Sequence, residues 1–519
     1  MARRGSVLVG VLLAVWLVVG CTGPATTPST SPTSGPSGTE TQLPRAAEPL
    51  AFRDVAAFSG VGVIYAGPGS CNGTLIDTGI PSGPAYVLTA GHCVGIVERL
   101  PAQATWIEDE WSGTADFPRV ANGRVDFLTA LVVERAYSTT RHTDTAILRL
   151  DISLGELEES GVRPVPLAAA EPAEGSVVAN VASRVQDVEP ELWVLRRGEC
   201  TLGSQHTLIE SSWLWFGAWS NDCPDVEPGY SGSPLFSLRA DGSPKAIVGM
   251  ITTGTGDVSP AGAGACSLNQ PCELTAEGLR MVERTTYAQS VAGIGRCFDN
   301  AGRFTLGDEC PLPTSSIWAE SGGGSFRGGD LPNSLGATPS VSVVGRHAGT
   351  ARTALVPFGD GRACQREETY SGAATVALRK AAKPGEALGV PVDVDLPETE
   401  GHYLLCAVRG HDYEGAAAVL FEVDRTPPLI AATAEVEDIG EGNLRVTPQL
   451  NPPEISAVRS MWGPPDTVNC ADPTGFYPAD PSPKPLAISA ANLPVRYCIY
   501  GQDAAGNATG IAVINLPQG

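Results

Sequence analysis

The chain has 519 residues, with 34 Lys and Arg against 57 Asp and Glu, a net charge of −23 and a pI near 4.7. The length predicts about three or four domains of ~150 residues each. The basic residues occur at most in short pairs. Nucleic-acid-binding proteins need a clustered basic surface, so the sequence excludes that class. A large negative net charge keeps a protein soluble, and it is typical of exported proteins. The 60 glycines and 43 prolines favour turns and short strands over long helices.

Residues 1–21 have the pattern of a signal peptide. Arg3 and Arg4 precede an apolar run over 7–20, shorter than the ~20 residues of a membrane-spanning helix. Residues 18–21 resemble the lipobox of bacterial lipoproteins. That resemblance implies cleavage at Cys21, lipidation, and a lipid anchor in the bacterial cell membrane facing the extracytoplasmic side. The alternatives are an ordinary secretory signal, with Cys21 incidental and the protein secreted, or an uncleaved anchor.

The rest of the chain divides by composition. Residues 22–49 are rich in Ser, Thr and Pro and predict a disordered tether. Residues 50–297 predict an all-β barrel or sandwich, because short β-branched runs alternate with Gly and Pro. One modest helix is expected over 287–294. Residues 298–335 predict a cysteine-clipped extension with a Gly-rich linker. The expected strands of the β region are 61–65, 71–76, 86–90, 125–133, 145–150, 176–181 and 246–251.

The C-terminal part contains a repeat. Residues 403–415 resemble 497–507, and Asp412 and Asp503 lie 91 residues apart in corresponding places. This spacing suits one small β-sandwich per copy, over 336–426 and 427–519. The pattern resembles the tandem Ig-like or fibronectin-like modules of bacterial surface proteins, which implies a spacing role or a surface ligand that the sequence does not identify.

Cysteine usage agrees with export. Of 13 cysteines, 12 are left once Cys21 is set aside, and an even set in an exported chain predicts disulfides. No CxxC motif and no Cys/His cluster with zinc-like spacing occurs, so no metal is expected. Pairing of neighbours along the chain is expected: Cys71 with Cys93, Cys200 with Cys223, Cys266 with Cys272, Cys297 with Cys310, Cys364 with Cys406, and Cys470 with Cys498.

Three short motifs carry the chemistry. Ser231 lies in the turn Gly-Tyr-Ser-Gly-Ser-Pro, His92 in Thr-Ala-Gly-His-Cys after an apolar strand, and Asp144 at the start of another strand. A serine hydroxyl needs a neighbouring base, and histidine titrates near neutrality. An aspartate can fix the tautomer of that histidine. The glycines of the turn leave the N–H groups of Gly229 and Ser231 free to converge on an oxygen.

These motifs, with Cys-Asn-Gly-Thr-Leu-Ile at 71–76, resemble the chymotrypsin/trypsin-like serine peptidases. The order His, Asp, Ser is that of this family. The resemblance covers about residues 50–297. It implies two β-barrels, the triad His92, Asp144 and Ser231, an oxyanion hole from the N–H groups of Gly229 and Ser231, no cofactor, and protein or peptide substrates. His142 and His206 are alternative bases, but neither lies in such a motif.

The sequence departs from the family pattern next to Ser231. Tyr230 stands where zymogens of the family have an Asp, so activation through that ion pair is not expected. Ser233 replaces a second Gly, as in bacterial glutamyl-endopeptidase-like relatives. The substrate pocket is expected at Thr252, Thr253 and Gly254, and the lack of a histidine on that strand argues against Glu selectivity. Asp225 is either the acid that binds basic side chains or a solvated loop carboxylate.

Two hypotheses follow. The first is an exported serine endopeptidase that hydrolyses proteins through an acyl-enzyme intermediate, with an all-β peptidase domain followed by two β-sandwiches. The second is a surface-binding or adhesion protein whose peptidase domain is an inactive scaffold. The presence of all three triad residues favours the first.

Overall fold

The computed structural model describes residues 46–516 except for short segments. The predicted signal peptide with Cys21 and most of the predicted tether lie outside the described residues. Within the described part, no helix has both the length and the apolar character needed to cross a membrane. The gaps are 67–68, 95–104, 122, 184–193, 211–212, 257–265, 267–268, 276–277, 315–316, 322–333, 336–340, 346–348, 359–361, 379–389, 393–396, 424, 429–430, 452–456, 480–484 and 504–506.

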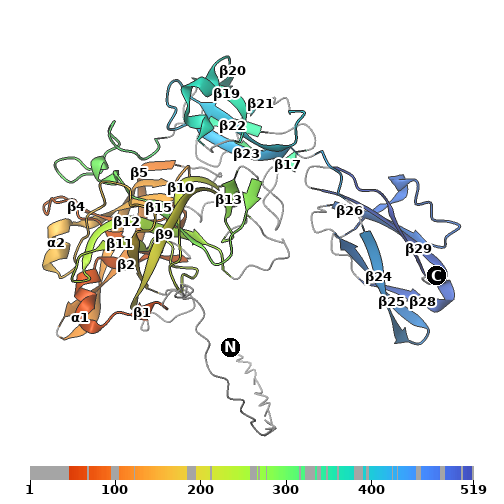
Figure 1. The fold of residues 1–519 in the computed structure, drawn as a ribbon, viewed down its shortest axis with the longest axis horizontal. Coiled ribbons are helices and arrows are strands. Elements are labelled where there is room, and N and C mark those ends of the chain that lie inside the picture. The colour runs from red at the N-terminus through yellow and green to blue at the C-terminus, as the bar shows by residue number, and fades with distance from the viewer. Residues whose placement is uncertain are drawn as a thin grey trace, which may run out of the picture. The chain divides into compact units, whose positions relative to one another are not determined.

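The first part of the fold is a closed six-stranded barrel (Figure 1). Its strands pair in the order β2-β3-β4-β7-β6-β5, all antiparallel. Both faces of β4 are covered, because the consecutive residues Val87 and Leu88 point to opposite sides of the strand and are both fully buried. The strands are β2 (Val61–Ala66), β3 (Gly69–Leu75), β4 (Pro84–Thr89), β5 (Thr105–Ala121), β6 (Arg124–Thr139) and β7 (Thr145–Ser153).

The second part is a sheet that returns on itself as a ring. The order is β10-β15-β12-β11-β8-β9, and a further pairing of β9 with β10 closes it. Three short strands, β1 (Glu48–Pro49), β13 (Cys272–Thr275) and β14 (Gly278–Arg280), extend the sheet beside β9. The ring strands are β8 (Val177–Ser183), β9 (Leu195–Glu210), β10 (Trp213–Asn221), β11 (Pro234–Leu238), β12 (Pro244–Gly254) and β15 (Thr286–Ser290).

The helix expected over 287–294 is wrong for most of its length. Residues Thr286–Ser290 form β15, which pairs with β12 on one side and β10 on the other. The ring supplies hydrogen-bond partners on both edges of this segment, and that tertiary context overrides its local preference. The described helices of this part are short: α1 (Phe52–Val55), η1 (Ala56–Phe58), η2 (Gly91–Val94), α2 (Leu154–Glu159) and η5 (Ile294–Cys297).

The C-terminal part consists of further β-sheets. A three-stranded sheet, β16-β18-β21, shares a core with a five-stranded sheet, β17-β23-β22-β19-β20. β16 lies inside the segment expected as extension and linker. The elements are β16 (Ile317–Ser321), β17 (Ser334–Leu335), β18 (Val341–Gly345), β19 (Gly349–Pro357), η6 (Ala363–Gln365), η7 (Glu367–Tyr370), β20 (Ala374–Leu378), β21 (Val390–Val392), β22 (Gly401–Val408) and β23 (Ala417–Val423).

A second pair of sheets follows, β24-β25-β28 and β27-β26-β29-β30. Val446 and Ile488 from one sheet pack with Tyr497 and Ile499 from the other. The elements are β24 (Ala431–Gly440), β25 (Asn443–Asn451), β26 (Ala457–Gly463), η8 (Pro473–Gly475), β27 (Tyr477–Ala479), β28 (Leu486–Ser489), η9 (Ala490–Asn492), β29 (Val495–Gln502) and β30 (Ala512–Leu516).

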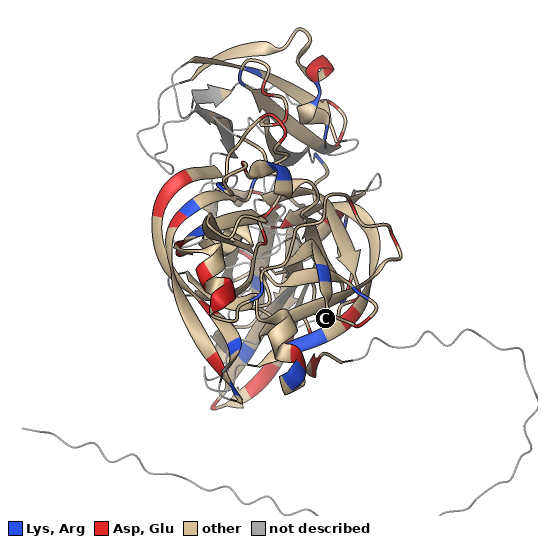
Figure 2. Ribbon diagram, turned by 90° about the vertical axis from the view of Figure 1, so that its left-hand side faces the viewer, with Lys and Arg blue, Asp and Glu red and all other residues tan. Residues whose placement is uncertain are grey.

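The twelve cysteines form six disulfides, each between neighbours along the chain. They are Cys71–Cys93, Cys200–Cys223, Cys266–Cys272, Cys297–Cys310, Cys364–Cys406 and Cys470–Cys498. The last two reach β22 and β29, the strands that carry the repeated sequence. The positions of acidic and basic residues are interspersed along the ribbon (Figure 2), and some of these residues form surface pairs, such as Arg119 with Asp126 at 3.4 Å.

The first C-terminal sheets share apolar contacts with the β9–β10 hairpin. Leu214 and Phe216 of the hairpin belong to one buried cluster with Leu404 and Cys406 of β22 and with the Cys266–Cys272 disulfide. Arg141, almost completely buried, donates from Nη1 to the carbonyl of Gly415 at 3.0 Å. The hairpin is therefore packed against a second layer of protein.

Candidate active site

His92 lies in the short η2 turn that follows β4. Gly91 is required there, because a Cβ would lie 2.0 Å from the carbonyl oxygen of Thr139. The Cys71–Cys93 disulfide ties this turn to β3. Closing a loop of 22 residues in this way contributes about 3 kcal/mol in the entropic account. The residues before and after His92 are thus both fixed in place, and 15% of the His92 side chain is exposed.

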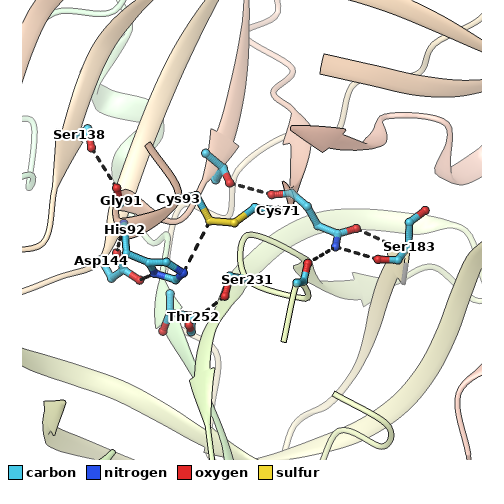
Figure 3. The surroundings of a disulfide bond; sticks show 12 residues. Cys71, Gly91, His92, Cys93, Ser138, Asp144, Ser183, Ser231 and Thr252 are labelled. Atoms are coloured by element: carbon cyan, nitrogen blue, oxygen red, sulfur yellow. Dashed lines mark hydrogen bonds and ion pairs between the residues drawn. A yellow bond between two sulfur atoms is a disulfide. The ribbon is translucent and has the colours of Figure 1, made fainter. Parts of the chain in front are cut away.

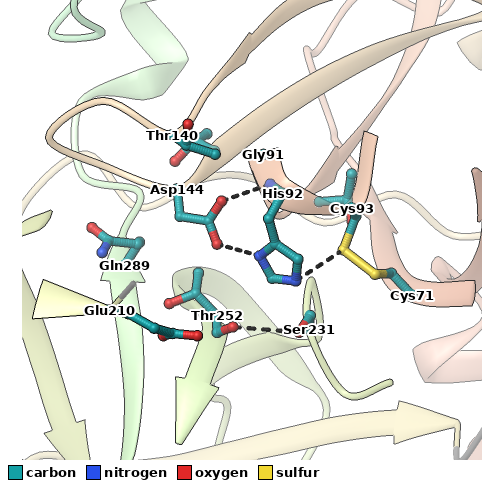
Figure 4. A network of polar contacts seen from close by, with 12 residues as sticks. Cys71, Gly91, His92, Cys93, Thr140, Asp144, Glu210, Ser231, Thr252 and Gln289 are labelled. Carbon is teal, nitrogen blue, oxygen red and sulfur yellow. Dashed lines mark hydrogen bonds and ion pairs between the residues drawn. A yellow bond between two sulfur atoms is a disulfide. The ribbon is translucent and has the colours of Figure 1, made fainter. Parts of the chain in front are cut away.

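Asp144 fixes the orientation of His92 (Figure 4). Its carboxylate is fully buried at the start of β7, where Oδ1 accepts the backbone N–H of His92 at 2.8 Å. Its Oδ2 lies 2.6 Å from His92 Nδ1. Since an ionised carboxylate only accepts hydrogen bonds, the Nδ1 proton is assigned to the imidazole and Nε2 is left as the basic nitrogen.

The environment raises the basicity of His92. Burial lowers its pKa, but the charge of Asp144, the hydrogen bond to Asp144 and the charge of Glu210 together outweigh burial. The pKa of His92 therefore lies above its ordinary value. A base of this kind is suited to accept a hydroxyl proton near neutral pH.

Ser231 lies in the turn between β10 and β11. Gly229 and Gly232 have positive φ angles of 94° and 84°, which hold the turn in the left-handed region. The Ser231 hydroxyl donates to the carbonyl of Thr252 at 3.3 Å, and His92 Nε2 lies 3.7 Å from Cys93 Sγ. In this state the serine proton is held by Thr252, and a rotation of the hydroxyl must precede transfer to His92.

The turn also presents backbone donors. The N–H groups of Tyr230 and Gly232 bond to the carbonyls of Glu227 and Ile251. Among the backbone hydrogen bonds of the described residues, none uses the N–H of Gly229 or Ser231. Two donors are thus left over next to the hydroxyl.

Asn72 links the barrel to the serine turn, and the sequence did not single out a role for this residue. Figure 3 shows the neighbouring Cys71, Ser183 and Ser231 in these surroundings. Asn72 Nδ2 donates to the carbonyls of Ser183 at 3.0 Å and Gly229 at 2.7 Å, and its Oδ1 accepts the N–H of Ser183 at 2.8 Å. Its backbone N–H donates to the carbonyl of Ser231 at 2.8 Å. The side chain is fully buried, and a buried polar group of this kind needs hydrogen-bond partners, which these three side-chain bonds supply.

Replacing Asn72 with Ala is expected to lower the free energy of unfolding by about 2–3 kcal/mol, because buried groups of Ser183 and Gly229 lose their partners. We expect kcat to fall about tenfold as the turn loses its anchor. Urea denaturation and peptide hydrolysis measure the two effects. The exposed Asn300, replaced by Ala, is the control. Equal stability of the two variants would contradict this role.

The predicted pocket residues lie in different surroundings. Thr252 and Thr253 are buried at the end of β12, and the Thr252 carbonyl contacts Ser231. Gly254 ends the strand and is partly exposed. Asp225 is exposed, has a φ of +55°, and accepts the backbone N–H of Ala47 at 2.8 Å. Its carboxylate is thus engaged with the N-terminal segment.

The other two candidate histidines are in poor positions to act as the base. His142 packs on Phe216 with ring centroids 4.8 Å apart, and burial, with the charges of Arg141 and Arg362, lowers its pKa to about 3. His206 lies 3.5 Å from Glu273, and burial lowers its pKa as well.

A barrel and a ring of β-strands, with a His–Asp pair on one and a glycine-flanked serine turn on the other, define the class of this part of the chain. Residues 71–250 match the family model of the trypsin-like peptidase domain, so this part is a trypsin-like peptidase domain. None of the curated proteins matches the chain.

The solved structures that resemble the chain include two serine proteases. One is neuropsin, a serine protease expressed in the limbic system of mouse brain, with 15% sequence identity, 48% of this chain and 95% of that chain covered, and a TM-score of 0.27. The other is the thermostable serine protease AL20 from an extremophilic microorganism, with 14% identity, 46% and 94% covered, and a TM-score of 0.28.

Proposed function

We propose that the protein is an exported serine endopeptidase that hydrolyses proteins or peptides with Ser231, His92 and Asp144. One observation carries the proposal. The fully buried Asp144 carboxylate accepts hydrogen bonds from both the backbone N–H and the Nδ1 of His92, beside the serine turn. Such an arrangement is costly to bury and has a direct use in nucleophilic catalysis.

The reaction would proceed by acyl transfer. Ser231 Oγ attacks the scissile carbonyl carbon while His92 Nε2 takes the hydroxyl proton. The N–H groups of Gly229 and Ser231 stabilise the oxyanion, a contribution of about 3–4 kcal/mol per donor in measured cases. The C–N bond then breaks, and His92 returns the proton to the leaving amine. Water then attacks the ester carbonyl carbon while His92 takes its proton, the bond from that carbon to Ser231 Oγ breaks, and His92 returns the proton to Ser231 Oγ.

The edge of β12 offers a place for an extended substrate. β11 pairs with β12 as far as Pro234 opposite Met250, which leaves residues 252–254 beyond the end of that pairing. A peptide lying along this edge as an added strand would present an N–H to the Thr252 carbonyl. That N–H would displace the Ser231 hydroxyl, which then becomes free to turn toward His92.

The remaining parts fit an exported protein. Six disulfides are typical of an oxidising compartment. Together with the signal sequence, they support an extracytoplasmic location, with Cys21 as the site of a lipid anchor. We assign the C-terminal sheets a role as Ig-like modules that space the peptidase domain or bind a surface ligand.

Covalent labelling tests the proposal. The full-length protein is incubated with a biotinylated fluorophosphonate, and the adduct is mapped by mass spectrometry. We expect one adduct per chain, on Ser231, and none after heat denaturation. A folded protein that is not labelled and cleaves nothing in a peptide library would favour the alternative, an inactive surface-binding scaffold. The Ser231 hydroxyl bonded to Thr252 is the observation on which that alternative rests.

A further inference from the structure

Trp213, the first residue of β10, lies against His92. The Trp213 ring stacks on the His92 ring, with centroids 6.1 Å apart and an angle of 26° between the planes. A second stack, 5.3 Å between Trp213 and Trp215, supports it. Glu210 is the direct partner of Trp213 across the hairpin. Opposite residues of an antiparallel pair lie on the same face, so Glu210 shares the face that meets His92.

The Glu210 carboxyl is buried in this position. The residue is 2% exposed, and its Oε1 accepts the backbone N–H of Asn269 at 2.8 Å, from the loop closed by Cys266–Cys272. Its Oε2 is buried with no hydrogen-bond partner among the described residues. Figure 4 shows the side chain pointing into the same network as Asp144, His92 and Thr252.

We propose that Glu210 is a positioning residue of this site, whose carboxylate stabilises the imidazolium form of His92 together with Asp144. The proposal rests on the function assigned above to Ser231. His92 must carry a positive charge while it holds the serine proton, and each nearby negative charge lowers the energy of that state. Asp144 acts by direct contact, whereas Glu210 acts through space.

The charges around the two groups support this role. Asp144 and Glu210 are the carboxylates that raise the pKa of His92. The pKa of Glu210 is raised to about 7, chiefly by burial and also by the charge of Asp144, although the Thr253 hydroxyl, the N–H of Asn269 and the charge of His92 lower it. On the adjacent β13, Glu273 is bonded to Arg280 and Tyr287 instead. Glu210 therefore gains its charge as the pH rises through about 7.

A purely structural role explains Glu210 poorly. A buried carboxyl with a free oxygen costs stability, and Gln would fill the same space without a charge. The sign of the linkage is clear. The folded protein favours the protonated form, so the contribution of Glu210 to stability is present below its ordinary pKa and is lost as the pH rises through about 7. We therefore expect Glu210→Gln to raise the Tm at pH 8 and to change it little at pH 4.

The first test measures the histidine directly. The His92 resonance is titrated by NMR in Ser231→Ala and in Ser231→Ala/Glu210→Gln, which is feasible because the chain has six histidines. We expect the second change to lower the His92 pKa by about half a unit to one unit. Glu199→Gln, an exposed carboxylate on the same strand, is the control and leaves it unchanged. An unchanged His92 pKa in the Glu210 variant overturns the proposal.

The second test uses the active protein. Glu210→Gln is expected to shift the acid limb of kcat/KM to lower pH and to lower kcat at pH 8 about three- to tenfold, with KM unchanged. Glu210→Asp, which keeps the charge, should restore most of both. A raised KM with an unshifted limb would instead make Glu210 a substrate contact and overturn the proposal. A wild-type protein without activity removes the proposed function, while the NMR titration still decides the role of Glu210.

Discussion

Alanine in place of Ser231 is expected to lower kcat for peptide hydrolysis by about 10⁵- to 10⁶-fold. In the proposed mechanism the Ser231 hydroxyl forms the acyl-enzyme, and the remaining rate would come from the backbone donors and from binding. Stability should hardly change, because the hydroxyl makes one hydrogen bond of 3.3 Å to Thr252. We expect a change of less than about 1 kcal/mol in the free energy of unfolding.

Ser233→Ala is the matched control for this prediction. Ser233 is fully buried and its Oγ accepts a hydrogen bond from Asn180 Nδ2 at 2.9 Å. Its loss should cost about 1–2 kcal/mol of stability and change kcat much less than Ser231→Ala. Hydrolysis assays and urea denaturation of both variants should therefore show a loss of activity in Ser231→Ala and a loss of stability in Ser233→Ala. Retained activity in Ser231→Ala would rule out Ser231 as the nucleophile.

Asp144→Asn is expected to lower kcat by about 10⁴-fold without disturbing the fold. The reason lies in the two hydrogen bonds that the carboxylate accepts. The backbone N–H of His92 can only donate, so it keeps the amide oxygen, and the amide nitrogen then faces Nδ1. Nδ1 must accept from this nitrogen, so the ring proton moves to Nε2. A protonated Nε2 cannot take the proton of Ser231.

Peptide hydrolysis measures this effect, and the rate of fluorophosphonate labelling should fall with kcat. The control is Asp126→Asn, a half-exposed carboxylate paired with Arg119 on the barrel surface, which should leave both rates unchanged. A similar thermal unfolding temperature for the two variants would show that the rate falls because the tautomer of His92 changes and not because the fold is less stable. Near-normal activity in Asp144→Asn would show that His92 is oriented by something else.

The candidate catalytic residues could be predicted from the sequence because each lies in a short local motif. The structure places His92 in hydrogen-bond contact with Asp144 and sets Ser231 beside them in the same polar network. Neighbouring cysteines pair because each pair closes a local loop or spans adjacent strands. The β character of residues 50–297 was readable from composition and alternation, and the peptidase domain over 71–250 agrees with it.

Residues that act across long sequence separations were not readable. Asn72 acts on Ser183 and Gly229, which are 111 and 157 positions away. Glu210 is an ordinary strand residue until the hairpin brings it to His92. β15 was mistaken for a helix because its two neighbouring strands lie elsewhere in the chain. In each case the decisive partner is supplied by the fold.

The apolar cluster between the β9–β10 hairpin and β22 bears on how this protein can evolve. Leu214 and Phe216, next to Trp213, pack in one cluster with Leu404 and Cys406. Residues that share a packed cluster have coupled effects on stability, so a change on one side alters which changes the other side tolerates. We therefore expect substitutions in the peptidase domain and in the sheets that follow it to be inherited together. Recombination that exchanged the C-terminal sheets without the peptidase domain would disturb the packing of the β9–β10 hairpin, whose Trp213 stacks on His92.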